Sequence, residues 1–360
     1  MKIKFHAFSV LLVLVLFCIP YPLIAGPFEN NSLSGISAVS VSTGDTSTAS
    51  EIPVVEDSLL RKANQNIITG AFFQFWGSDN DKQASDWEKE LSAMRAIGMD
   101  TIIIQSNQSS GVNFSEATEL VLEEADKTGM NVFIGTALNE DGWYSNRFNP
   151  VYLHNAGKDV AKYTEILVKQ FSPHKSFVGL YIPYEENTMA SAVLMGEFYG
   201  KISKAAKNIK PELKVLISPF TAVVPQYSIS MPAWRIKNYF ETLFKRGGID
   251  ICALQDGIGC SSGRLEKISE DLTAISEACK NTGVEFWANV EIFEPNKSKD
   301  PDSFKFIPAN MDRISKQISA EGPFATKIIC FDFNHYFSPN SGNELAQKLY
   351  NDYLDYIESK

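Results

Sequence analysis

The stretches Val178-Gly-Leu-Tyr-Ile-Pro-Tyr-Glu-Glu186 and Val284-Glu-Phe-Trp-Ala-Asn-Val-Glu291 decide the expected fold. Each is a short apolar run of the kind that forms a buried strand, and each ends on glutamate. Barrels built from alternating strands and helices carry their working residues at the C-terminal ends of the strands. Two acids delivered in this way are what a barrel needs to hydrolyse a glycosidic bond.

Further β-type runs alternate with helical stretches from Ile67 onward. The expected strands are residues 69–75, 100–105, 131–136, 178–183, 214–218, 249–255, 284–290 and 327–332. Strand–helix alternation at this spacing predicts a parallel sheet, and eight units predict an α/β fold, a closed (β/α)8 TIM barrel in a single domain. An open, doubly wound sheet is the alternative. It is disfavoured because neither a GxGxxG nor a GxxxxGK[ST] motif is present.

The ends of the expected helices carry familiar signals. A glycine suited to the left-handed position that closes a helix stands before four of the strands: Gly98, Gly129, Gly248 and Gly283. The first helix is expected to open with the capping box Ser85-Asp-Trp-Glu88. The last helix is expected to place Leu345, Leu349, Tyr353 and Ile357 on one apolar face.

The N-terminal 62 residues are expected to lie outside the barrel. Residues 1–25 have a basic start, an apolar middle and a small residue before Gly26, which is typical of a signal peptide. We therefore expect export to the periplasm or the cell exterior, with retention as an N-terminal membrane anchor as the alternative. Residues 26–62 are rich in serine and threonine and predict a flexible linker, which leaves residues 63–360 for the barrel.

Composition restricts the partners. The chain has 360 residues and a net charge of -10 without a basic block, which argues against nucleic acid or a membrane partner beyond the N-terminal segment. Four histidines and the absence of an HExxH or CxxC motif predict no metal and no cofactor. Cleavage of the signal peptide would leave Cys252, Cys260, Cys279 and Cys330, whose spacing is not that of a dense disulfide scaffold.

Amides, acids and flat rings follow the expected strands, and this mixture suits sugars, whose hydroxyls hydrogen-bond while their C–H faces stack on aromatic rings. The candidate substrate-binding residues are Gln74, Trp76, Gln105, Trp143, Tyr181, Gln255, Asp256, Asn289, His335 and Tyr336. For two of them a structural role is an equal alternative. Asp256 is expected to orient a catalytic group or bind a hydroxyl, but it also precedes Gly257 in a turn-like pair. His335 lies among aromatic residues that it can pack against.

Glu185 and Glu291 are the candidate catalytic residues. Retaining hydrolysis needs a carboxylic acid and a carboxylate about 5 to 5.5 Å apart. Glu186, Glu285 and Glu294 are rival acids, although Glu186 and Glu294 are also typical of solvated loop charges and Glu285 of a strand-face charge. Because neighbouring strand residues face opposite sides, only one of Glu185 and Glu186 is expected to point inward. We favour Glu185. For Glu291 the alternative is a structural carboxylate that pairs with a neighbouring strand.

Four blocks, residues 175–185, 215–220, 250–260 and 286–293, resemble the secreted bacterial domain-of-unknown-function 4434 family. That family is regarded as glycoside-hydrolase-like, and the resemblance implies a barrel related to the retaining glycosidase clan A. It also implies an acid/base at Glu185 and a nucleophile at Glu291. The clan usually has asparagine directly before the acid/base, whereas Tyr184 stands here, so Asn289 or Gln255 is expected to supply the hydrogen bond to the sugar 2-hydroxyl.

Three functions are consistent with these residues. The first is a retaining O-glycosyl hydrolase that acts on an oligo- or polysaccharide. The second is a chitinase-like hydrolase, in which the substrate's own N-acetyl group replaces the nucleophile. The third is a barrel that binds glycans without cleaving them.

Overall fold

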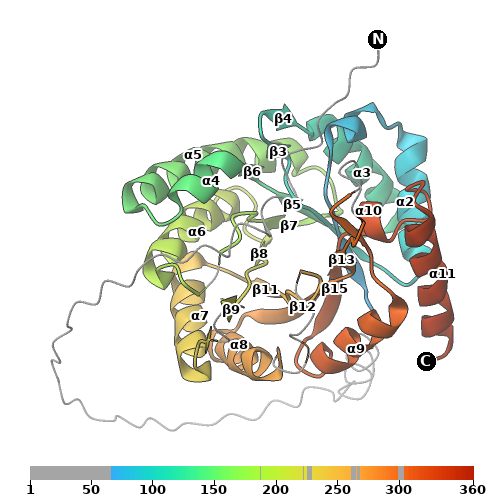
Figure 1. The fold of residues 1–360 in the computed structure, drawn as a ribbon. Helices are drawn as coiled ribbons and strands as arrows, with labels where there is room; N and C mark the ends of the chain where they lie inside the picture. The colour runs from blue at the N-terminus through green and yellow to red at the C-terminus, as the bar shows by residue number, and fades with distance from the viewer. Residues whose placement is uncertain are drawn as a thin grey trace, which may run out of the picture. The chain divides into compact units, whose positions relative to one another are not determined.

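Eight parallel strands close into a barrel in the order β1-β15-β12-β11-β8-β7-β5-β2, as seen in the computed structural model (Figure 1). Their bounds are β1 Gly70–Phe73, β2 Thr101–Ile104, β5 Asn131–Gly135, β7 Phe177–Tyr181, β8 Lys214–Ile217, β11 Ile251–Gln255, β12 Glu285–Glu291 and β15 Lys327–Phe331. Each overlaps a predicted strand, so the TIM barrel is confirmed. The open sheet is excluded because the first strand pairs with the last, Gly70 with Ile329.

The structure describes residues 66–186, 188–221, 223–224, 229–260, 265, 268–298 and 304–360. The predicted signal peptide and linker lie outside these residues. Within the described part, no helix combines the length and the hydropathy that crossing a membrane requires.

Helices follow the strands and surround the barrel in Figure 1. The longer ones are α2 Ala84–Ala96, α3 Ser115–Thr128, α5 Pro150–Phe171, α6 Ala192–Lys207, α7 Ala233–Gly247, α8 Ile268–Thr282, α9 Met311–Glu321 and α11 Glu344–Glu358. Short elements in the loops that follow strands are η2 Gly77–Asp81, α4 Glu140–Asn146 and α10 Phe333–Tyr336. The remaining strands are β3 Gln108–Ser109, β4 Val112–Asn113, β6 Ala137–Leu138, β9 Val223–Val224, β10 Ile229–Ser230, β13 Phe293–Pro295 and β14 Phe306–Pro308.

Large side chains fill the inside of the barrel. The buried interior cluster consists of Phe72, Ile103, Phe133, Tyr181, Leu216, Ile251, Ala253, Trp287 and Ile329. Gly179 makes room for one of them, because a Cβ atom at this position would lie 2.1 Å from the ring of Phe133. A barrel packed in this way is a core and not a pore, so a ligand site must form in the loops beyond the strand ends.

The signals predicted at the C-terminal ends of helices are confirmed, whereas the one predicted at the N-terminus of the first helix is corrected. The four predicted glycines, Gly98, Gly129, Gly248 and Gly283, all have positive φ. The predicted capping box of α2 is wrong. The helix begins one residue before Ser85, because the backbone N–H of Gln83 donates to the carboxylate of Asp86 at 3.1 Å and starts the first turn earlier.

The predicted apolar face of α11 is correct only in part. Leu349 and Tyr353 are buried, and the Tyr353 hydroxyl accepts the backbone N–H of Ile68 at 2.6 Å. Leu345 is 46 % exposed. It belongs to the first turn of the helix, directly after the N-cap Asn343, where the side chain remains in contact with solvent.

Candidate active site

Glu185 follows β7 and is held by two donors. The hydroxyl of Tyr181, which is fully buried in the barrel interior, donates to Glu185 Oε1 at 2.6 Å. The side chain of Gln255, at the end of β11, also hydrogen-bonds to this carboxyl group. Burial raises the pKa of Glu185, and both donors oppose the rise because they favour the charged form. A raised pKa suits a carboxyl group that must carry a proton near neutral pH.

Glu186 lies in a different environment. It is 2 % exposed, and its Oε2 atom lies 3.8 Å from Nε of Arg147, at the end of α4. The two neighbouring glutamates therefore contact different groups, Glu185 the Tyr181 hydroxyl and Glu186 the Arg147 guanidinium. Of the two, Glu185 has the contacts with residues of the barrel strands.

Glu291 is the last residue of β12 and is 2 % exposed. Its Oε2 atom accepts the backbone N–H of Cys260 at 3.1 Å and also a hydrogen bond from the backbone of Gly259. The glycine allows this approach, because a Cβ atom at position 259 would lie 2.9 Å from the same oxygen. Burial, aided by the nearby carboxylate of Asp256, raises the pKa of Glu291 to about 8.

Asp256 supports Glu291 from within the protein. It is 1 % exposed, and its carboxylate accepts backbone N–H groups from Ile258 at 2.9 Å and from Glu291 at 3.4 Å. Gln317 on α9 donates to Asp256 Oδ2 at 2.5 Å and to the Glu291 carbonyl at 3.3 Å. These bonds fit the predicted role of orienting a catalytic group, here Glu291, and also the turn-forming role before Gly257. They do not favour the predicted contact with a sugar hydroxyl, because Asp256 is 1 % exposed.

Helix α9 also contributes to the cluster around Glu291 and Asp256, which was not predicted from the sequence. Arg313 donates through Nη2 to the Glu291 carbonyl at 2.9 Å, and Glu321 is fully buried. Burial, together with Asp256, raises the pKa of Glu321 well above its ordinary value. A signal for this was present, because Gln317 and Glu321 are polar residues one turn apart on the face that also buries Ile314 and Ile318.

Trp143 corrects another prediction. The ring is fully buried and contacts Tyr184 at 5.0 Å and Phe198 at 5.7 Å between ring centroids. No face of this ring is open to a sugar, so the predicted substrate contact is wrong. The short helix α4 turns the side chain toward α6 and away from solvent. Tyr184, the residue in place of the usual asparagine, is held in the same aromatic cluster.

The helix α4 instead contributes Glu140, which the sequence analysis did not single out. Glu140 is 6 % exposed and accepts the hydroxyl of Ser109 at 3.1 Å. Burial raises its pKa, and the neighbouring charges of Asp141 and Glu185 add to the rise. Glu140 is therefore a further carboxyl group whose pKa responds to the charge of Glu185. Its position directly after Asn139, the N-cap that follows the third barrel strand, was the available signal.

Two of the predicted residues are register partners on β11 and β12. Gln255 is half-buried and donates to the Ser218 carbonyl at 2.6 Å, and its register partner on β12 is Asn289. Asn289 is 1 % exposed and donates to the Ser218 hydroxyl at 3.0 Å. Because Gln255 is more exposed and touches Glu185, it is the better placed of the two to contact a sugar hydroxyl.

The remaining predicted residues gather on the β1, β2 and β15 side of the mouth. The ring of Trp76 stacks on His335 with centroids 3.9 Å apart, and Gln74 and Asn334 exchange two hydrogen bonds of 3.1 and 2.8 Å. Tyr336 is 8 % exposed and packs on Phe293. Gln105 is half-buried at the end of β2.

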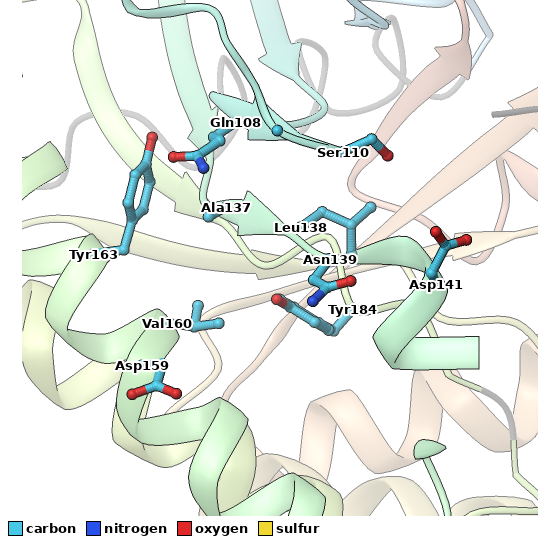
Figure 2. Close-up of a pocket in the computed structure, with 11 residues that line it drawn as sticks. Gln108, Ser110, Ala137, Leu138, Asn139, Asp141, Asp159, Val160, Tyr163 and Tyr184 are labelled. Atoms are coloured by element: carbon cyan, nitrogen blue, oxygen red, sulfur yellow. The ribbon is translucent and has the colours of Figure 1, made fainter. Parts of the chain in front are cut away.

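A hollow of about 460 Å³ lies beside this mouth, over the small sheet of β3, β4 and β6 (Figure 2). Gln108 lines it from β3, Asp141 from α4, which follows the N-cap Asn139, and Tyr163 from α5. Neither Glu185 nor Glu291 belongs to its wall. The hollow is therefore a neighbour of the candidate catalytic residues and not their site.

The chain matches a known protein family over most of its length. The family described as "Domain of unknown function (DUF4434)" matches residues 68–343. The chain belongs to this family. No curated protein sequence matches it.

Solved structures share the fold of this DUF4434 member. A "putative alpha-L-fucosidase" from Bacteroides thetaiotaomicron is 21 % identical with a TM-score of 0.67, covering 89 % of this chain and 100 % of that one. A GH2 β-galacturonidase from Eisenbergiella tayi is 15 % identical with a TM-score of 0.53, covering 82 % and 51 %. A β-galactosidase from Marinomonas ef1 is 8 % identical with a TM-score of 0.54, covering 81 % and 60 %. These glycosidase structures confirm the barrel as the shared fold.

Proposed function

We propose that the chain is a glycoside hydrolase of the retaining type, in which Glu185 is the acid/base and Glu291 the nucleophile. The observation that carries the proposal is the environment of Glu185. It is a carboxyl group at the mouth of the barrel, held by Tyr181 and Gln255 and with its pKa raised by burial. General acids of glycosidases are carboxyl groups kept protonated in this way.

In the proposed reaction the two acids have different roles. Glu185 gives its proton to the leaving glycosidic oxygen while the bond between that oxygen and the anomeric carbon breaks. A Glu291 oxygen forms the new bond to the anomeric carbon, and Oε2 is already occupied by the N–H of Cys260. In the second step Glu185, now ionised, takes a proton from water as the water displaces Glu291.

One observation favours the chitinase-like alternative. With a pKa of about 8, Glu291 is mostly protonated at pH 7 and attacks only in its ionised fraction. A substrate-assisted reaction needs no enzymic nucleophile and uses Glu185 alone. Glu291→Gln separates the two, because it stops the retaining reaction and spares the assisted one. If the unchanged protein binds glycans but does not hydrolyse them, the remaining function is that of a non-catalytic glycan-binding barrel.

The test begins with a glycan array, followed by product analysis on the glycans that bind. A 2-deoxy-2-fluoroglycoside of the sugar so identified, with a good leaving group, then traps the glycosyl-enzyme. Mass spectrometry is expected to locate the label on Glu291. A label on Glu185 or Glu140 would overturn the assignment of roles, and hydrolysis of no array glycan would overturn the proposed activity.

Export is part of the same proposal. Residues 1–25 have the layout of a signal peptide, and a polymeric glycan is met outside the cytoplasm. Expression of the full chain in a bacterium, cell fractionation and N-terminal sequencing test it. We expect cleavage after Ala25 and a periplasmic or secreted product. An uncleaved, membrane-bound product would indicate the N-terminal anchor.

A further inference from the structure

A cavity of about 490 Å³ opens at the rim of the barrel mouth, on the side of β1 and β15. Three separate parts of the sequence form its wall. Trp76 and Ser78 come from the loop after β1, Glu90 from α2, and His335 and Asn340 from the segment that leads from β15 to α11. The volume lies within the range of about 300 to 1,000 Å³ that is typical of ligand pockets.

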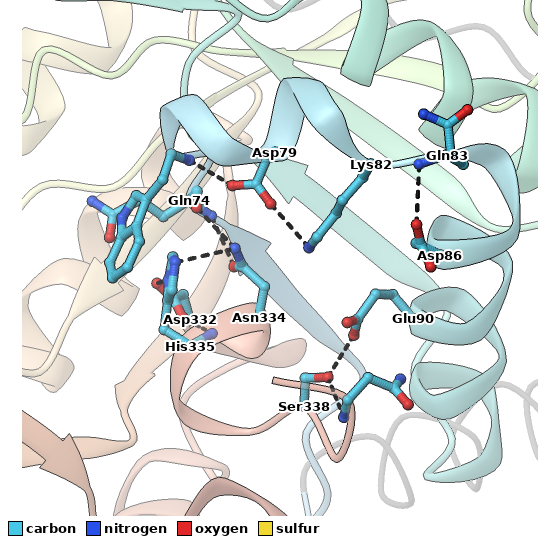
Figure 3. Close-up of polar contacts among 12 residues, drawn as sticks. Gln74, Asp79, Lys82, Gln83, Asp86, Glu90, Asp332, Asn334, His335 and Ser338 are labelled. Carbon is cyan, nitrogen blue, oxygen red and sulfur yellow. Dashed lines mark hydrogen bonds and ion pairs between the residues drawn. The ribbon is translucent and has the colours of Figure 1, made fainter. Parts of the chain in front are cut away.

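Glu90 places a carboxyl group in this wall although it is only 4 % exposed. Its Oε2 atom accepts the hydroxyl of Ser338 at 2.6 Å, and the same hydroxyl oxygen accepts the backbone N–H of Asn340 at 3.0 Å. Figure 3 shows this contact beside the other polar residues of the wall. A buried carboxyl group fixed by a serine is a preformed acceptor for the hydroxyl of a ligand.

Apart from Glu90, the charged residues of the wall form ion pairs with one another. Lys82 lies 2.9 Å from Asp79 (Figure 3), and Lys89 lies 3.3 Å from Asp86. The cavity thus offers many donors and acceptors with little net charge. A strongly anionic or cationic ligand would have to compete with these internal pairs, whereas a neutral ligand rich in hydroxyl groups would not.

The wall is rigid on the side that faces the mouth. His335 stacks on Trp76 with an angle of 24° between the rings, and its Nδ1 atom lies 2.8 Å from Oδ2 of the buried Asp332. Asn334 donates to the Gln74 carbonyl at 2.8 Å and ties the ends of β15 and β1 together. These contacts hold the aromatic pair beside the ends of β1 and β15.

We propose that this cavity is an accessory subsite that binds one neutral pyranose ring of the substrate glycan, outside the catalytic centre. The proposal rests on the proposed glycosidase function for its role, but the binding itself is separate from catalysis. Glu90 accepts a ring hydroxyl, Lys82 and Asn340 donate to others, and Trp76 offers the aromatic edge of the wall.

The experiment measures binding of single sugars by saturation-transfer difference NMR. The probes are the methyl pyranosides of glucose, galactose, mannose, fucose and N-acetylglucosamine, added to the full chain that carries Glu185→Gln. Ser78→Trp fills the cavity, because Ser78 is exposed and lines it. Ser85→Trp is the matched control, since it makes the same change on an exposed residue that does not line the cavity. Asn340→Trp replaces Ser78→Trp if that variant does not fold.

We expect at least one pyranoside to bind the parent and the Ser85→Trp protein, and to lose roughly ten-fold or more in affinity in the Ser78→Trp protein. With Glu185 restored, Ser78→Trp should raise KM for an oligosaccharide about ten-fold more than KM for an aryl monoglycoside. Pyranoside binding that Ser78→Trp and Asn340→Trp leave unchanged would overturn the subsite, while hydrolysis would still stand. Pyranoside binding that Ser78→Trp weakens, in a protein that hydrolyses no glycan, would overturn the proposed activity but support the sugar-binding subsite.

Discussion

The hydroxyl of Tyr181 donates a hydrogen bond of 2.6 Å to Glu185 from inside the barrel core. The donor favours the ionised carboxylate, so it counteracts the effect of burial on the Glu185 pKa. A carboxyl group that must both give and take a proton benefits from such a balance. A residue of the barrel interior thus helps to set the pKa of the proposed acid.

Tyr181→Phe is expected to raise the pKa of Glu185 further, since it removes the donor and leaves the burial. The carboxyl carbon of Glu185 can be followed by ¹³C NMR titration, with Glu185→Gln to assign the signal. Tyr199→Phe is the matched control, because its hydroxyl donates to the Tyr184 carbonyl and not to Glu185. An unchanged titration in Tyr181→Phe would contradict the hydrogen bond.

Glu185→Gln is expected to lower kcat by roughly 10²- to 10⁴-fold on a glycoside whose leaving group needs protonation. Glu186→Gln, the neighbouring change, should retain most of the activity, because Glu186 lies beside Arg147 and not beside Tyr181. Steady-state kinetics on both variants measures this. The reverse order, with Glu186→Gln inactive and Glu185→Gln active, would show that Glu186 is the acid and that the assignment to Glu185 is wrong.

The ionisation of Glu291 should control the rate of trapping by a 2-fluoroglycoside with a dinitrophenyl leaving group, which needs no acid. Below its pKa of about 8, Glu291 is protonated and cannot attack, so trapping should be slow at pH 6 and rise to a plateau above pH 8. Asp256→Asn removes the neighbouring charge that raises this pKa and should move the midpoint to lower pH. A midpoint that does not respond to Asp256→Asn would show that Asp256 does not act on Glu291.

The barrel was predictable from the sequence because its signals are local and repeated. Apolar runs such as 284–290 mark buried strands by composition alone, and glycines such as Gly129 mark helix ends by the φ angle that they allow. Glu291 ends β12 as its run predicted, whereas Glu185 lies in the loop beyond Tyr181, the last residue of β7. Each strand could therefore be recognised without knowing what it contacts.

The details of the site were not predictable because they depend on contacts between distant segments. Trp143 follows a strand, as a sugar platform would, yet α6 provides Phe198 to cover it. Asp256 ends a strand, yet Gln317 from α9 makes it an internal acceptor. In both cases the sequence places the residue near the mouth, and a helix that lies tens of residues away decides whether the side chain is exposed.

The buried acids make the stability of the domain depend on pH. Glu321 has a folded-state pKa well above its ordinary value, because burial disfavours its charged form. Its contribution is fully present below the unfolded-state pKa near 4.5 and is lost as pH rises toward the folded-state value. Glu321→Gln removes this titration, so relative to the unchanged protein it should increase the free energy of unfolding more at pH 8 than at pH 5. Urea unfolding at the two pH values measures the difference, with Glu358→Gln, an exposed residue of α11, as the control. An equal effect of Glu321→Gln at both pH values would mean that Glu321 is not a buried titrating group.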